Sequence, residues 1–151
     1  MPVFMNDEAF IKKGYQISMD GSLLDFEMIF NYLDGQSYWA KGMPPEKLRK
    51  AIENSMCFGV YKNSIQVGFA RVVSDKATFA YLCDVFILPA NQGVGLSKWL
   101  MQNIMAHPDL QGLRRWSLAT LDAHGLYKQF GFTEINNPER WMQIFTPYIA
   151  D

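Results

Sequence analysis

Residues 89–100 read PANQGVGLSKWL, and the rest of the chain is arranged around this stretch. An apolar and aromatic run, residues 81–88, leads into it, and a helical pattern over residues 96–106 leads out. Gly93 and Gly95 let the backbone come close to a ligand without side chains in the way. A strand, a glycine turn and a helix N-terminus together present unpaired N–H groups at the positive end of a helix dipole. The stretch therefore predicts an anion site, most naturally for phosphate.

The composition indicates one ordered domain, residues 1–151, with a core of its own. The chain has 49% hydrophobic and 19% charged residues and a formal net charge of −1. This charge gives no reason to expect nucleic acid as a partner, because nucleic-acid binders usually carry a basic excess. No apolar stretch approaches the ~20 residues needed to cross a bilayer, and nothing near the N-terminus reads as a signal peptide. We therefore expect a cytoplasmic protein without a membrane partner.

The two cysteines predict neither a metal site nor a disulfide. Cys57 and Cys83 lack the spacing of metal ligands, so no metal is expected. Both fall in strand-like runs, which favours reduced, buried thiols.

Turn signals divide the chain into alternating strands and helices, while residues 1–12 are expected to be frayed or loosely packed. The expected strands are residues 15–18, 57–62, 65–74, 78–88, 116–120, 132–135 and 141–145. The expected helices are residues 23–33, 44–52, 96–106 and 123–130. Short polar links predict an antiparallel meander for the three strands between residues 57 and 88. The strand–helix–strand unit over residues 78–120 needs a crossover, so its two strands should be parallel, in a mixed α/β sheet with helices on its faces.

Two sequence blocks together resemble one protein family. Residues 92–97 (QGVGLS) resemble the pyrophosphate loop of the GCN5-related N-acetyltransferases (GNAT), with the pattern Arg or Gln, two residues, Gly, one residue, then Gly or Ala. Ser97 departs from that pattern, but it is small and its hydroxyl could add a phosphate contact. Residues 123–132 (AHGLYKQFGF) are similar to the family's later motif of alanine, then Leu-Tyr, then Gly-Phe after three residues. The resemblance covers roughly residues 57–145 and implies the GNAT fold, a mixed central sheet of an antiparallel meander plus a parallel strand–helix–strand unit, flanked by helices.

The resemblance implies an acetyl-CoA-dependent N-acetyltransferase. In this family acetyl-CoA, as co-substrate, donates its acetyl group directly to a bound amine, so no nucleophilic cysteine is needed. The acceptor would be a small-molecule or peptide amine, and a homodimer is common in the family. The whole chain looks like a group of small bacterial members without a known acceptor.

The family's cofactor contacts carry over position by position. Backbone amides of residues 92–97 would cradle the pyrophosphate, and residues 85–87 would pair their backbone with the pantetheine arm and supply the oxyanion donor. Thr120 stands where many members have an asparagine, so one contact would be altered. The implied cofactor-binding residues are Val85, Phe86, Ile87, Gln92, Gly93, Val94, Gly95, Leu96, Ser97, Thr120 and Tyr127.

Two residues are the candidates for proton transfer. Tyr127, in the second motif, would be the general acid that protonates the departing CoA thiolate, and a mild lowering of its pKa would help. An alkyl amine costs about 4.6 kcal/mol to deprotonate at pH 7, so such an acceptor asks for a base. Asp84 lies where family members often place an acidic base or a water-holding group; an ion pair with Arg71 is the structural alternative. His124 is a weaker candidate for the base, because it occupies a variable place in its motif.

An acceptor pocket and two other function classes remain open. Tyr38, Trp39 and Tyr81 could line a pocket that suits an amine cation or an aromatic substrate, or they could cap the sheet. The non-catalytic alternative is an acyl-CoA-binding or sensing module on the same fold. A different phosphate-ligand enzyme is a third class, although the loop lacks the Gly-Lys-Ser/Thr ending of nucleotide triphosphatases.

Overall fold

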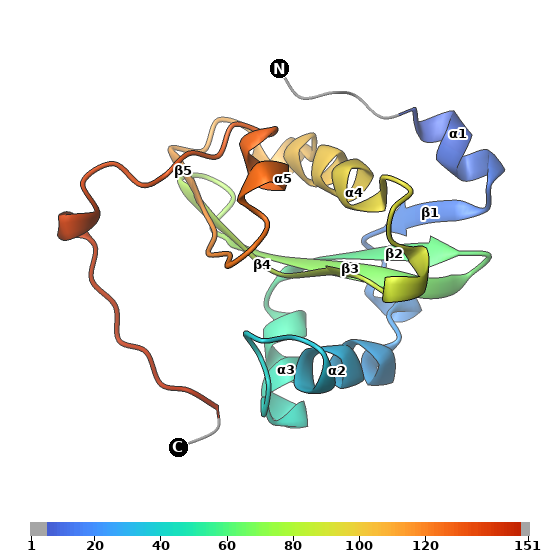
Figure 1. Ribbon diagram of the computed structural model, residues 1–151, viewed down its shortest axis with the longest axis horizontal. Coiled ribbons are helices and arrows are strands. Elements are labelled where there is room, and N and C mark those ends of the chain that lie inside the picture. Colours follow the sequence, from blue (N-terminus) through green and yellow to red (C-terminus); the bar gives the residue numbers. More distant parts are fainter. Residues whose placement is uncertain (1–5, 149–151) are drawn as a thin grey trace.

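A computed structural model describes residues 6–148, which form a five-stranded sheet between two layers of helices (Figure 1). The strands are β1 (Tyr15–Ser18), β2 (Met56–Lys62), β3 (Ile65–Ser74), β4 (Phe79–Ile87) and β5 (Arg115–Ser117). The α-helices are α1 (Asp7–Lys12), α2 (Phe26–Gly35), α3 (Pro45–Glu53), α4 (Leu96–Met105) and α5 (His124–Lys128). Short 3-10 turns are η1 (Gly21–Leu23), η2 (Pro89–Asn91), η3 (Pro108–Leu110) and η4 (Pro138–Arg140).

The sheet topology confirms the predicted mixed α/β arrangement. The strand order is β1-β2-β3-β4-β5, with antiparallel pairs from β1 to β4 and a parallel pair between β4 and β5. The link from β4 to β5 runs through α4, as the strand–helix–strand pattern requires. The chain therefore has the expected meander followed by one crossover unit.

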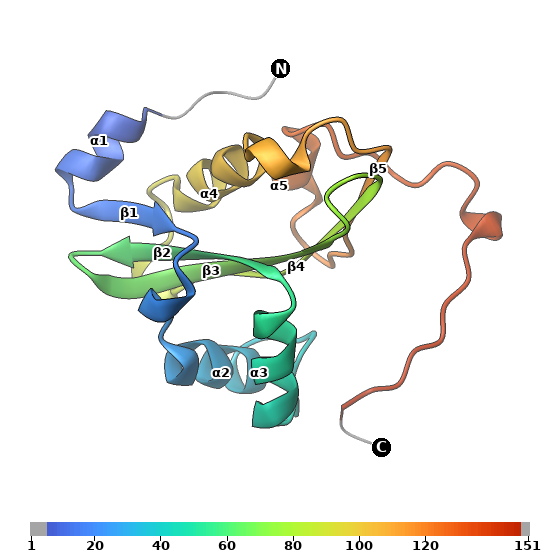
Figure 2. The ribbon, with the colours of Figure 1, turned by 180° about the vertical axis from the view of Figure 1, so that it is seen from behind.

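Each face of the sheet has its own hydrophobic cluster. Helices α1, α4 and α5 cover one face, and α2 and α3 cover the other, in both views (Figures 1 and 2). On the first face Leu100 and Ile104 of α4 pack in one cluster with Val60 of β2, and on the second Ile29 of α2 packs with Phe69 of β3. These side chains have no exposed surface, and full burial of each stabilises the fold by about 1.5–3 kcal/mol. Because helices pack on both faces of the sheet, the faces are closed to a ligand, and a binding site is expected at the ends of the strands.

Helix α1 corrects the expectation that the first twelve residues are loosely packed. Asn6 caps the helix because its side-chain oxygen accepts a hydrogen bond from the Ala9 N–H at 3.4 Å. Phe10 then stacks on Trp99 of α4 with ring centroids 4.5 Å apart. The tertiary contact to α4 orders a helix whose own sequence is too short to be stable alone. The rest of that expectation, residues 1–5, lies outside the described residues.

The last two predicted strands, residues 132–135 and 141–145, do not form. β5 is the final strand and is shorter than predicted. After it, Asn137 adopts a left-handed φ of 58° and η4 turns the chain away, so that residues 141–148 run along the outside (Figure 1). A strand is stable only when its N–H and C=O groups find a neighbouring strand, and within the described part of the chain this segment is paired with none.

Candidate active site

The strands β4 and β5 separate beyond their first three residue pairs. Their parallel register ends at Tyr81 and Ser117, whereas β4 continues to Ile87. Residues 118–120 follow β5 without belonging to a strand. β4 and the segment that continues β5 therefore diverge toward their C-terminal ends, which is where ligands bind in open α/β sheets.

A β-bulge bends β4 at the same level. Phe69 and Arg71 of β3 face Phe86 and Cys83 of β4, so β4 carries one extra residue. Asp84 lies in this bulge with a left-handed φ of 54°, a conformation that aspartate tolerates better than most residues. A bulge interrupts the ladder with the neighbouring strand, so it frees backbone groups of β4 for a ligand.

The glycine loop has the geometry of an anion site. Gly93 and Gly95 have φ of 85° and 90°, and Gly95 is the N-cap of α4. A Cβ atom placed on Gly93 would meet nothing within 4 Å, so the space in front of the loop is open. The first turn of α4 carries no acidic residue. The two glycines line a cavity of about 420 Å³, and Lys98 lines the same cavity. Free N–H groups, the helix dipole and a lysine fit a phosphate-bearing group such as the pyrophosphate of CoA.

The loop residues play unequal parts in this cavity. Gln92 uses its side-chain amide to donate a hydrogen bond to the Ile87 carbonyl at 2.9 Å, which ties the loop to the end of β4. Leu96 is buried, so it offers only its backbone, while Ser97 is half-buried and lines the cavity. Val94 is exposed and lies outside the residues that line the cavity.

The strand residues predicted to bind the pantetheine arm lie on both faces of β4. Val85 and Ile87 belong to the cluster under α4, and Ile87 also lines the phosphate cavity. Phe86 points to the opposite face, where it stacks on Tyr32 of α2 with ring centroids 3.9 Å apart. Side chains of these three residues serve the two cores, so a ligand between β4 and β5 would meet their backbone.

Tyr127 of α5 lies in a second cavity of about 770 Å³ beside β5. Its side chain is nearly buried and packs edge-on against Phe132 with ring centroids 6.0 Å apart. Burial, with smaller contributions from nearby Tyr38 and Asp122, raises the pKa of Tyr127 to about 12. The hydroxyl is therefore protonated at any physiological pH, and the mild lowering of its pKa that would help an acid is absent. Thr120 lines the same cavity and its Oγ1 accepts a hydrogen bond from the Ala123 N–H at 3.0 Å, just before α5.

Asp84 is buried at the centre of a polar network. Its Oδ1 accepts a hydrogen bond from the Trp39 indole N–H, and its Oδ2 accepts one from Arg71 Nε, both at 2.9 Å. Arg71 also donates from Nη1 to the Ser55 hydroxyl at 3.0 Å. The ion pair that the sequence left as an alternative is therefore present. Each carboxylate oxygen has two lone pairs, so Asp84 keeps acceptor capacity for a further proton donor.

The three aromatic residues predicted for an acceptor pocket gather around this network. Tyr38 and Trp39 pack edge-to-face with ring centroids 5.0 Å apart, and both are partly exposed. Burial raises the pKa of Tyr81, and the charges of Cys83 and Asp84 add to that rise. The Tyr38 hydroxyl accepts a hydrogen bond from the Leu121 N–H at 2.8 Å, so the loop before α3 is joined to the loop before α5.

The structure adds residues that the sequence analysis did not single out. Asn91 and Lys98 line the phosphate cavity, and the position of Lys98 directly after Ser97 was the available signal. Asp122 lies near enough to Tyr127 to raise its pKa, and only tertiary structure reveals this proximity. Cys57 and Cys83 are both free, as predicted.

Metal and membrane features are absent from residues 6–148. Over this range no three His, Cys, Asp or Glu side chains are grouped as metal ligands would be. None of the helices described there is long and apolar enough to cross a bilayer.

Residues 6–148 thus form a mixed α/β sheet whose parallel pair of strands opens beside a glycine loop at the start of a helix. The family model for the acetyltransferase (GNAT) domain matches residues 27–146, and this chain belongs to that family. The protein is thus an acetyltransferase by family, as the two motifs predict.

Known proteins agree with this assignment. A Gibberella zeae protein whose name assigns it provisionally to the acetyltransferases is 34% identical over 135 residues, 75% of each chain. The crystal structure of a Xanthomonas campestris pv. campestris protein, provisionally assigned to the same family, is similar at a TM-score of 0.87 and 52% identity, covering 89% of this chain and 95% of that one. The N-acetylglutamate synthase of Neisseria gonorrhoeae, solved with coenzyme A and N-acetylglutamate, shares the fold at a TM-score of 0.63 and 16% identity, over 83% of this chain and 31% of that one.

Proposed function

We propose that this protein moves the acetyl group of acetyl-CoA to the primary amine of a small molecule or peptide by direct attack, with Tyr127 as general acid. The observation that carries the proposal is the position of α5, which borders both the cavity at the glycine loop and the cavity beside β5. Leu126 lines the phosphate cavity, and the next residue, Tyr127, lines the cavity beside β5. A single domain, a cytoplasmic location and a homodimer belong to the same proposal.

Cofactor binding is assigned to the glycine loop and β4. Backbone N–H groups of residues 93–97 hold the pyrophosphate, with Lys98 adding a positive charge at the same cavity, whereas the N–H of Gln92 already donates to the Pro89 carbonyl at 3.3 Å. The backbone of residues 85–87, freed in part by the bulge, pairs with the pantetheine arm and donates to the acyl oxygen as it gains charge. When bound, acetyl-CoA supplies an activated thioester. Because these contacts come from the backbone, they tolerate the departure at Ser97.

The hydroxyl of Tyr127 donates a hydrogen bond to the sulfur as the carbon–sulfur bond breaks. With the pKa of Tyr127 at about 12 and that of a thiol near ~8.5, full proton transfer from the phenol to the departed thiolate is unfavourable by roughly 5 kcal/mol. A cationic amine close to the phenol offsets part of this difference, because a nearby positive charge favours the phenolate. Proton donation by Tyr127 is therefore coupled to attack by the amine.

Asp84 is assigned the role of general base, which takes the proton that the amine must lose. Its remaining acceptor positions can take a hydrogen bond from the ammonium group or from a water between them. Trp39, which donates to the same carboxylate, and Tyr38, which packs against Trp39, offer aromatic faces to an amine cation. The arrangement suits a cationic acceptor.

The test separates cofactor binding from turnover. Acetyl-CoA should raise the melting temperature, since a ligand at 100 times its Kd stabilises the native state by about 2.7 kcal/mol. Tyr127→Phe should lower kcat by about 10²- to 10⁴-fold with a panel of amines, while that melting shift stays the same. Tyr61→Phe is the matched control, because the Tyr61 hydroxyl is buried in the main body of the sheet and has no hydrogen-bond partner among residues 6–148.

Each outcome decides between the function classes. No melting shift with acetyl-CoA far above micromolar concentration contradicts the cofactor assignment. Binding without turnover of any amine favours the acyl-CoA-binding or sensing module. Equal kcat in Tyr127→Phe and wild type removes Tyr127 from proton transfer.

A further inference from the structure

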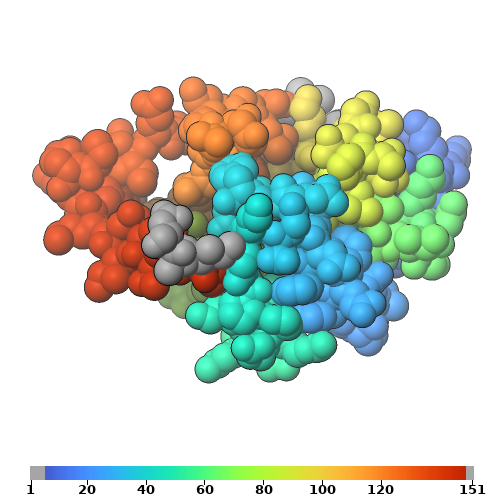
Figure 3. All heavy atoms as spheres, turned by 60° about the horizontal axis from the view of Figure 1, so that its bottom comes forward, coloured from blue at the N-terminus to red at the C-terminus, as the bar shows by residue number. Residues whose placement is uncertain are grey.

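Helix α1 packs against α4 close behind the glycine loop. The Trp99 indole N–H of α4 donates a hydrogen bond to the Asp7 carboxylate of α1, and the Phe10 ring stacks on the Trp99 ring at an interplanar angle of 9°. The end of α4 that carries the loop is the end nearest α1 in both ribbon views (Figures 1 and 2). In the space-filling view the yellow segment that includes the loop lies at the surface next to the blue N-terminal segment (Figure 3).

Trp99 connects α1 to the first turn of α4. It lies four positions after Gly95, the N-cap, and its backbone N–H donates to the Gly95 carbonyl at 3.1 Å. Side chains in an α-helix tilt toward the helix N-terminus, so the Trp99 ring lies over the turn that begins at Gly95. The ring is buried. A contact that holds this ring therefore also holds the backbone turn whose free N–H groups form the anion site.

Helix α1 is itself fixed to the sheet, so it can support α4. The Phe10 ring packs edge-on against the Tyr15 ring of β1, with centroids 6.1 Å apart. The Gly14 carbonyl, between α1 and β1, accepts a hydrogen bond from the Asn63 N–H at 2.9 Å, just past the end of β2. The support thus runs without a break from the sheet through α1 to Trp99.

The glycine loop needs support from its neighbours. Gly93 and Gly95 have left-handed φ and wide backbone freedom, so their own sequence does not hold them in one conformation. The Gln92 side chain ties the start of the loop to the Ile87 carbonyl of β4. The contact of α1 with Trp99 ties the other end, where the loop becomes α4.

The hydrogen bond between Asp7 and Trp99 is a strong contact from outside the matched domain. Its acceptor is a carboxylate, and charge-assisted hydrogen bonds are roughly twice as strong as those between neutral groups. The family model matches residues 27–146, so α1 lies before the matched part of the chain. An element outside the matched residues therefore contacts the helix that begins at the phosphate loop.

We propose that Asp7 is a positioning residue for acetyl-CoA binding. Through Trp99 it holds the first turn of α4 in the conformation that presents its N–H groups to the pyrophosphate. The inference rests on the proposed function, because it takes the glycine loop as the pyrophosphate site. When this contact is lost, the turn is ordered for a smaller fraction of the time, and the apparent Kd rises in inverse proportion to that fraction.

The first test measures acetyl-CoA affinity by calorimetry, well below the melting temperature of every variant. Asp7→Ala should raise the Kd about tenfold, the factor expected if the turn is ordered for about a tenth of the time. Asp7→Asn keeps an oxygen that accepts from the indole N–H, so it should bind within about threefold of wild type. Phe10→Leu removes the stacked ring but keeps an apolar side chain, and it should raise the Kd about threefold or more.

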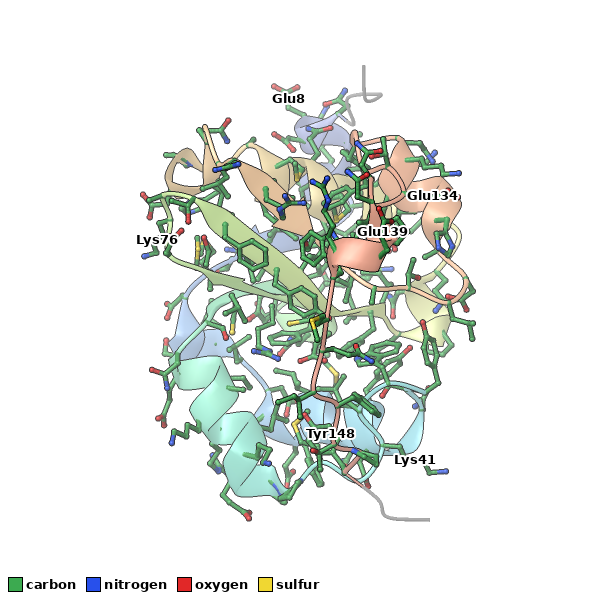
Figure 4. All side chains as sticks on the ribbon, turned by 90° about the vertical axis from the view of Figure 1, so that its left-hand side faces the viewer. Glu8, Lys41, Lys76, Glu134, Glu139 and Tyr148 are labelled. Atoms are coloured by element: carbon green, nitrogen blue, oxygen red, sulfur yellow. The ribbon has the colours of Figure 1, made fainter. Side chains whose placement is uncertain are left out.

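Glu8→Ala is the matched control. Glu8 follows Asp7 in the first turn of α1, carries the same charge and points into solvent (Figure 4). Both alanine variants remove one carboxylate from the N-terminus of the same helix, so only the contact with Trp99 distinguishes them. The Kd of Glu8→Ala should equal that of wild type.

Hydrogen exchange tests the support without any cofactor. The backbone amide of Trp99 should exchange with solvent deuterium faster in Asp7→Ala than in wild type, Asp7→Asn or Glu8→Ala. The amide of Val60 in β2 should exchange at the same rate in all four, because the sheet is unchanged.

The outcomes that overturn the positioning role are specific. They are an unchanged Kd in Asp7→Ala, an equal loss of affinity in Glu8→Ala, or a loss in Asp7→Asn as large as that in Asp7→Ala. If the wild-type chain does not bind acetyl-CoA, the proposed function fails, and the exchange rate of the Trp99 amide still decides whether Asp7 holds the start of α4. The two failures are therefore distinct.

Discussion

Replacing Arg71 with methionine tests whether the buried ion pair with Asp84 holds this side of the cleft together. The Arg71 side chain is 16% exposed and that of Asp84 is 4% exposed, at an N–O distance of 2.9 Å. Methionine fills similar space but leaves the carboxylate with the Trp39 indole as its hydrogen-bond donor. Removing one partner of a buried pair costs about 3–5 kcal/mol, because the remaining charge is not compensated. For a chain of this size that corresponds to a fall in Tm of roughly 6–20 °C.

Thermal and urea unfolding followed by circular dichroism would measure this loss. The double variant Arg71→Met/Asp84→Asn removes the charge and keeps an acceptor for the Trp39 indole, so it should recover at least half of the loss. The exposed pair of Lys76 and Asp109, at 3.8 Å, supplies the control, since Lys76→Met should change stability by less than about 1 kcal/mol (Figure 4). A loss below 1 kcal/mol in Arg71→Met, or no recovery in the double variant, would refute the reasoning.

Two further predictions concern the loop and the thiols. Gly93→Val should weaken acetyl-CoA binding at least tenfold by calorimetry, because the new side chain enters the open space before the loop. Gly112→Val is the control, because Gly112 has a similar φ of 68° but lies outside the glycine loop, so this variant should bind acetyl-CoA normally. Equal affinities in the two variants would argue against the assigned loop. Burial raises the pKa of Cys57 to about 11 and that of Cys83 to about 12. At pH 8 about one thiol in a thousand or fewer is therefore ionised, so maleimide should label the folded chain slowly. Fast labelling of the folded chain would show that the thiols are accessible.

The elements that local pattern predicted well are those whose pairing partner is close in sequence. The meander from β2 to β4 follows from short polar links, and the helix after the glycine loop follows from its apolar period. Residues 132–135 and 141–145 carry strand-like patterns as well, yet they form no strand in the described structure. A pattern shows that a segment can be a strand, but pairing requires a free edge within reach, and that depends on the whole fold.

The site divides along the same line. The glycine loop and Tyr127 could be placed from two motifs because each motif is a local arrangement of backbone and side chain. The hydrogen bonds from Trp39 to Asp84 and from Leu121 to Tyr38 span 45 and 83 positions, and no sequence spacing predicts them. The bulge at Asp84 depends on the register between β3 and β4, which is a property of the pair and not of either strand.

By itself, then, the sequence determined the family, the order of its elements and the place of the phosphate loop, because these rest on local periodicity and on glycines that permit a left-handed backbone. Tertiary structure alone decided that Asp84 is ion-paired, that Tyr127 has a raised pKa, and that residues 141–145 form no strand in the described part of the chain. Burial, charge pairing and strand pairing depend on which distant residues meet. That information exists only once the chain has folded.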